Sequence, residues 1–98
     1  MKQENDRINH GPIGVFDSGL GGLTVARAIA QALPHESIYY VGDTKRCPYG
    51  KRSEDQVRAF AIQAGRWLEA HAVKIMVIAC NTATAAALPL AQQLFSVP

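Results

Sequence analysis

The chain has 98 residues, and its 10 Lys and Arg against 8 Asp and Glu give a formal charge of +2. Hydrophobic residues make up 48% and charged residues 18%, which is typical of a folded globular protein and unlike a disordered one. The slight, scattered positive charge gives no indication of nucleic-acid binding. The two cysteines, Cys47 and Cys80, are too few for a disulfide framework and lack metal-knuckle spacing. We therefore expect one small domain in a reducing cytoplasm.

Residues 1–12 are polar, mix both signs of charge and lack the apolar core of a signal peptide. We interpret them as a polar leader and residues 13–98 as a single α/β domain. The longest apolar run, Ile75 to Cys80, falls far short of the about 20 residues that a membrane-spanning helix needs. We expect no membrane segment.

The first half of the chain predicts a strand, a helix and a second strand. A short apolar run at residues 13–16 predicts the first strand, and the polar, glycine-rich segment 17–22 ends it. Apolar residues recur at helical spacing over residues 23–33. Residues 37–41 are β-branched and aromatic, as in a strand, and a long polar loop at 42–50 follows them.

The second half begins with the helix whose boundaries are the clearest. Ser53 and Gln56 have the spacing of a capping box, and the apolar face after them continues to a helix end near His71. The almost continuous apolar run at 73–79 predicts a third strand, covered by helices on both faces.

A third helix should follow, because Asn81 and Thr82 can cap it and its start is rich in alanine. Pro89 removes a backbone donor, so we expect a kink or break near Leu88. The order strand, helix, strand, helix, strand, helix favours the α/β class, with an open parallel sheet and flanking helices (βαβαβα).

Three unusual segments, 17–22, 42–50 and 80–82, each follow a predicted strand directly. Ligands of open parallel sheets bind at the carboxyl ends of the strands, so we expect these loops to form the functional site. Asp17, Ser18 and the glycines after them suit an anion site or, equally, a tight turn closed by the Asp17 side chain. They match neither a Walker A nor a dinucleotide-binding motif.

Cys80 has two interpretations. At the start of a helix a thiolate is stabilised, which favours a reactive cysteine, whereas a buried cysteine at a strand end acts as a small hydrophobic residue. A Cys-His hydrolase is not favoured, because His10, His35 and His71 are not placed to serve as its base. Pro48-Tyr49-Gly50 predicts a turn, in which Tyr49 either packs or contacts a ligand, and Cys47 stays unassigned.

Taken together, three segments resemble the N-terminal half of the glutamate racemase (MurI) family. They are VFDSGLGGLTV at 15–25, YVGDTKRCPYG at 40–50 and VIACNTATA at 77–85. The resemblance covers residues 13–98 and implies half of a two-domain racemase fold with the active site between the domains. It also implies cofactor-independent interconversion of L- and D-glutamate in the cytoplasm, supplying D-glutamate for peptidoglycan. The complete protein would be a homo-oligomer that binds a small-molecule substrate. We expect no metal, no nucleic acid and no membrane among its partners.

The resemblance also implies roles for single residues. Inverting an α-carbon needs one group to remove a proton from one face and a second group to protonate the other face. By resemblance, Cys80 is one of these acid/base groups, and the substrate-binding positions are Asp17, Ser18, Tyr49, Gly50, Asn81 and Thr82.

One departure from the family concerns the second catalytic cysteine. The family carries it in a Cys-Thr-His segment of the C-terminal half, which has no match here, and Cys47 lies in a loop of the same half as Cys80. We therefore expect a fragment. The alternatives are a racemase of another amino acid such as aspartate, a non-catalytic fragment, and a module that binds a small carboxylate.

Overall fold

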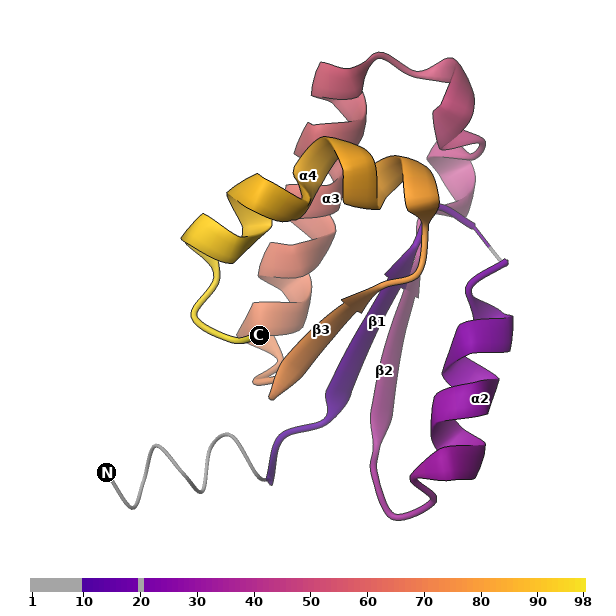
Figure 1. Ribbon diagram of the computed structural model, residues 1–98, viewed down its shortest axis with the longest axis vertical. Helices are drawn as coiled ribbons and strands as arrows, with labels where there is room; N and C mark the ends of the chain where they lie inside the picture. The colour runs from indigo at the N-terminus through magenta and orange to yellow at the C-terminus, as the bar shows by residue number, and fades with distance from the viewer. Residues whose placement is uncertain (1–9, 20) are drawn as a thin grey trace.

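The computed structural model describes residues 10–19 and 21–98, so most of the predicted leader, residues 1–12, lies outside the described residues. Six main elements alternate along the chain (Figure 1). They are β1 (Ile13–Asp17), α2 (Leu23–Ala32), β2 (Ile38–Gly42), α3 (Glu54–Ala70), β3 (Ile75–Ile78) and α4 (Asn81–Leu94). Two short 3-10 turns, Thr44–Arg46 and Tyr49–Lys51, lie between β2 and α3.

The three strands form one parallel sheet in the order β2-β1-β3, as the alternating pattern predicts. Ile13 pairs with Ile38 on one side and with Ile75 on the other, and Asp17 at the end of β1 pairs with Gly42. The central strand β1 is buried along its whole length. The α/β class and the parallel sheet with flanking helices are therefore confirmed.

The helices divide between the two faces of the sheet (Figure 1). Helices α3 and α4 pack together on one face, against β1 and β3, while α2 packs against β2 on the opposite face. This division follows from right-handed crossovers, because the chain moves from β1 outward to β2 and then back across β1 to β3.

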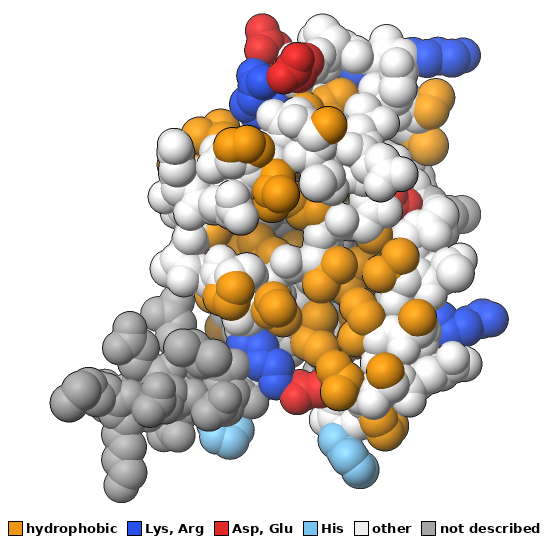
Figure 2. Space-filling model, viewed as in Figure 1, with side chains coloured by type: hydrophobic (Ala, Val, Ile, Leu, Met, Phe, Trp, Pro, Cys, Tyr) orange, Lys and Arg blue, Asp and Glu red, His pale blue; other side chains and the backbone are white. Residues whose placement is uncertain are grey.

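The prediction that the third strand is covered on both faces is wrong. Helix α2 lies on β2 and not on β3, so Ile75 stays 36% exposed and the other residues of β3 are half-buried. No residue of α2 is fully buried either, and Leu23 at its start is 48% exposed. Hydrophobic side chains therefore appear on the surface over the middle of the sheet (Figure 2).

The capping box that begins α3 is confirmed. The Ser53 hydroxyl accepts the Gln56 backbone N–H at 3.2 Å, and the Ser53 N–H donates to Gln56 Oε1 at 3.1 Å. Helix α3 then places Val57 and Leu68, both fully buried, against the sheet. None of the described helices is long and apolar enough to cross a membrane.

Of the kink or break predicted near Leu88, the break does not form. Helix α4 continues from Asn81 to Leu94 with Pro89 inside it. A proline inside a helix removes one backbone donor and crowds the carbonyl four residues earlier. Tertiary packing of the preceding turns compensates for this loss, because Ala83, Ala86 and Ala87 are buried in the same core cluster as the residues of α3.

We expect Leu68→Ala to lower the free energy of unfolding by about 2–5 kcal/mol, because it leaves a cavity between α3 and the sheet. Urea unfolding followed by circular dichroism measures this loss, and Leu94→Ala, at a position 47% exposed, is the matched control. Equal transition midpoints for the two variants would contradict the packing described for α3.

Candidate active site

The carboxyl ends of the three strands bring the three unusual segments to one edge of the sheet. The Asp43 backbone N–H donates to the Asp17 carbonyl at 3.0 Å, and the Ala79 N–H donates to the Phe16 carbonyl at 2.8 Å. The loops that begin at Asp17, Asp43 and Cys80 therefore start beside one another. This is the edge at which ligands of open parallel sheets bind.

Asp17 is a buried carboxylate held by backbone amides. Its Oδ2 accepts the Gly19 N–H at 3.2 Å and the Gly22 N–H at 2.8 Å, at the amino terminus of α2. The positive end of the helix dipole favours a negative charge at this place. A Cβ on Gly22 would lie 2.6 Å from the Asp17 Cβ, so only glycine allows this approach. The structure therefore has the tight turn closed by the Asp17 side chain. The Gly19 and Gly22 amides donate to Asp17 itself.

Cys80 is the N-cap residue of α4. Its Sγ lies 3.5 Å from the Ala83 backbone N–H, which donates to it, and the residue is half-buried. Asn81 and Thr82 form the exposed start of α4 immediately after it. The sulfur therefore faces the amino end of α4, and the residue packs against the hydrophobic core while staying partly exposed.

The structure commits the Tyr49 side chain to the core. Its ring is 1% exposed and lies 6.1 Å from the Phe16 ring and 5.7 Å from the Phe60 ring, centroid to centroid. Gly50, by contrast, is exposed, and the space around its Cα is open. Gly50 can therefore contact a ligand through its exposed backbone, whereas Tyr49 as a whole is buried.

Asp43 is a residue of this edge that sequence reasoning missed. Its Oδ2 accepts the Tyr49 hydroxyl at 2.5 Å and pairs with Arg46 Nε at 2.8 Å. Burial raises the pKa of Tyr49, and the hydrogen bond to Asp43 and the negative charge of that carboxylate raise it further. The available signal was an acid directly after the second strand in a loop that also carries a cation and a tyrosine.

The remaining predicted position, Ser18, is half-buried in the turn after β1. Among residues 10–19 and 21–98, no group of three or more His, Cys, Asp and Glu side chains could hold a metal ion.

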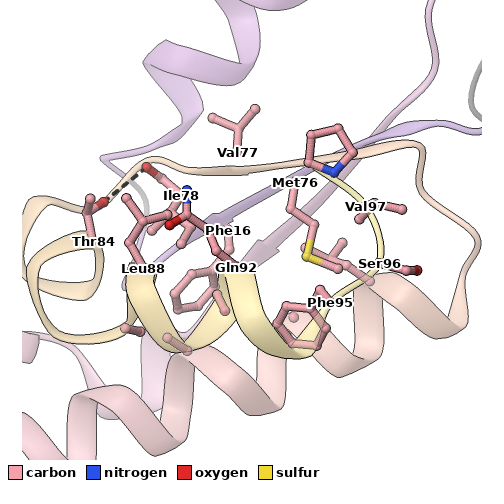
Figure 3. A pocket seen from close by; sticks show the side chains of 16 residues that line it. Phe16, Met76, Val77, Ile78, Thr84, Leu88, Gln92, Phe95, Ser96 and Val97 are labelled. Atoms are coloured by element: carbon pink, nitrogen blue, oxygen red, sulfur yellow. Dashed lines mark hydrogen bonds between the residues drawn. The ribbon is translucent and has the colours of Figure 1, made fainter.

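A cavity of about 580 Å³ lies elsewhere, between β3, α3, α4 and the last residues of the chain (Figure 3). Its lining is mostly apolar and includes Met76, Leu88 and Phe95, with Thr84 among its few polar side chains. None of the predicted site residues lines it. The candidate active site is therefore the open carboxyl edge and not this cavity.

Comparison with known proteins gives a consistent set of relatives. The chain is 60% identical over 82 residues to the glutamate racemase of Lysinibacillus sphaericus, covering 84% of this chain and 31% of that protein. Among solved structures, glutamate racemase RacE1 of Bacillus anthracis superposes with a TM-score of 0.87 at 50% identity, over 91% of this chain and 34% of that one.

A third relative was solved with a ligand. Glutamate racemase of Francisella tularensis, in complex with D-glutamate, has a TM-score of 0.81 at 46% identity over 85% of this chain and 32% of its own. No protein-family model matches the chain. The chain spans about a third of the length of the relatives that it matches.

We expect Gly42→Ala to destabilise the chain by about 1–3 kcal/mol, because the added Cβ would lie 2.6 Å from the Gly19 carbonyl oxygen. Gly50→Ala, with no atom within 4 Å of its new Cβ, is the matched control and should change stability by less than about 0.5 kcal/mol. Urea unfolding of both variants measures this difference. An equally stable Gly42→Ala variant would show that the loops after β1 and β2 do not touch.

The raised pKa of Tyr49 predicts a loss of stability in alkali. Above pH 10 the tyrosine of the unfolded chain ionises while the native Tyr49 keeps its proton, so the free energy of unfolding falls with rising pH. In Tyr49→Phe this fall should be less steep, by up to about 1.4 kcal/mol per pH unit. Urea unfolding between about pH 9 and 11.5 measures both slopes, and identical slopes would contradict the prediction.

Proposed function

Because this chain is homologous to the N-terminal third of glutamate racemases, we propose that it forms the N-terminal part of such an isomerase. The complete enzyme would interconvert L- and D-glutamate without a cofactor, and this chain would supply one of its two acid/base groups. The placement of Cys80 carries the proposal. It combines a free cysteine, the amino end of α4 and the ligand-binding edge of the sheet.

The reaction starts with the removal of the α-proton. The Cys80 thiolate takes this proton from one enantiomer, and the electron pair of the broken C–H bond passes to the α-carbon and its carboxylate. A group on the opposite side of the substrate then delivers a proton to the other face. In the reverse direction the Cys80 thiol is the proton donor, so neither oxidant nor reductant is consumed.

The α-proton of an amino acid is weakly acidic, so the developing negative charge needs hydrogen-bond donors in fixed positions. The side chains of Ser18, Asn81 and Thr82 and the exposed backbone of Gly50 would provide such donors at the carboxyl edge. Asp17 carries the one negative charge of the turn after β1, which suits it to orient the substrate ammonium group or the thiol. A buried acid held by two amides keeps one orientation for either task.

The second acid/base group belongs to the part of the enzyme beyond the homologous third. Cys47 does not fill this role, because its Sγ would lie 3.0 Å from a Cβ on Gly19, in the same group of loops as Asp17. We propose that the complete enzyme supplies D-glutamate for peptidoglycan in the cytoplasm and is a homo-oligomer.

A chimera tests the function. Residues 13–98 replace the matching segment of the Lysinibacillus sphaericus enzyme, and racemisation of L- and D-glutamate is followed by circular dichroism. We expect Cys80→Ser to lower kcat by about 10²–10⁴-fold, because serine is a much weaker acid and base at this position. Cys47→Ser, the matched control, should stay within about twofold of the unmodified chimera.

Exchange of the α-proton in heavy water separates the remaining outcomes. The chain of 98 residues alone should not racemise glutamate, because the group opposite Cys80 is missing, and any α-proton exchange that it shows should retain the configuration. A Cys80→Ser chimera that racemises at the unmodified rate would refute the assignment of Cys80. A chimera specific for aspartate would retain the mechanism and change the substrate.

A further inference from the structure

Two neighbouring tyrosines of β2 point to opposite faces of the sheet. Tyr39 is 39% exposed, and its ring lies 6.4 Å from Trp67 and 5.8 Å from His71, on the α3 side. Tyr40 pairs in register with Val15 and therefore lies on the α2 side, the side on which Asp17 also lies. The two residues thus have the same side chain at adjacent positions in different surroundings.

The Tyr40 hydroxyl binds the turn that holds Asp17. It donates to the Gly19 carbonyl at 2.7 Å, a contact between residues 21 positions apart. The N–H of the same Gly19 donates to the Asp17 carboxylate. Tyr40 therefore binds the carbonyl of Gly19, and the amide of Gly19 binds the Asp17 carboxylate.

The second amide that holds Asp17 is also next to this hydroxyl. A Cβ on Gly22 would lie 3.1 Å from the Tyr40 oxygen, and the Gly22 N–H donates to Asp17 at 2.8 Å. The hydroxyl therefore packs against both residues that donate to the carboxylate. A Cβ on Gly42 would also lie 3.0 Å from the Tyr40 ring, so the ring packs beside Gly42 as well.

Burial and the charge of Asp17 keep the Tyr40 hydroxyl protonated, so that it can donate a hydrogen bond. Burial raises the pKa of Tyr40, and the nearby negative charge of Asp17 raises it further. The hydroxyl is then protonated at neutral pH and above, so its hydrogen bond to Gly19 persists over the pH range in which the enzyme would work.

We propose that Tyr40 is a positioning residue, which fixes the orientation of the Asp17 carboxylate by anchoring Gly19 and packing against Gly22, the two residues whose amides hold it. The proposal rests on the function proposed above, because it gives Asp17 a task in the reaction. Loss of the hydroxyl leaves the Gly19 carbonyl without this donor and frees the turn to shift. Small displacements of an orienting group lower catalytic rates markedly.

The first test uses the racemase chimera with Tyr40→Phe, which removes only the hydroxyl, and with Tyr39→Phe as the matched control. We expect kcat/KM to fall about tenfold in Tyr40→Phe and to change less than twofold in Tyr39→Phe. A kcat/KM of Tyr40→Phe within twofold of the unmodified chimera would overturn the proposal.

A double-mutant cycle with Asp17→Asn separates positioning from a general structural effect. If Tyr40 acts through Asp17, adding Tyr40→Phe to Asp17→Asn should lower kcat/KM less than twofold further. The same tenfold loss in both backgrounds would show that Tyr40 acts independently of Asp17, which overturns the proposal.

Amide resonances of the 98-residue chain test the contact without any activity. We expect the Gly19 and Gly22 N–H resonances to shift in Tyr40→Phe and to stay in place in Tyr39→Phe. Unchanged resonances in Tyr40→Phe would overturn the anchoring of the turn. If the unmodified chimera does not racemise glutamate, the proposed function fails, and these resonances still decide whether Tyr40 anchors the turn.

Discussion

The arrangement at the carboxyl edge depends on one buried carboxylate, that of Asp17. It ends the central strand β1, and its Oδ2 receives two backbone amides at the start of α2. A buried acid is stable only when its charge is compensated, and here the amides and the amino end of the helix provide that compensation. The placement of Gly19 and Gly22 follows from this requirement, and the end of β2 packs against the Gly19 carbonyl through Gly42.

A second carboxylate, Asp43, organises the loop after β2 in a similar way. It binds the Tyr49 hydroxyl and Arg46, while Arg46 also lies over the Phe60 ring, 4.0 Å from its centroid. The loop is therefore fastened at one end to the strand that pairs with β1 and at the other to α3. Two acids at successive strand ends thus fix the loops on one side of Cys80, and the N-cap position fixes Cys80 itself.

Much of this fold could be predicted, because the relevant signals are local. Alternating elements, the capping box at Ser53 and the polar breaks after each strand are read from neighbouring residues, and the structure confirms all of them. The partner of Tyr40 could not be predicted in this way. Tyr40 binds a carbonyl 21 residues away, and no local pattern shows which side chain crosses from β2 to the turn after β1.

The wrong predictions have the same origin. An apolar run shows that a strand is hydrophobic, but whether a helix covers each face depends on the crossovers, which place α2 over β2 and leave Ile75 exposed. Likewise, the effect of Pro89 depends on alanines buried elsewhere in α4. The three loops of the carboxyl edge were easier to predict than their contacts, because each loop is a short, continuous segment directly after a strand. Their contacts join residues far apart in the chain, and only the folded sheet brings these together.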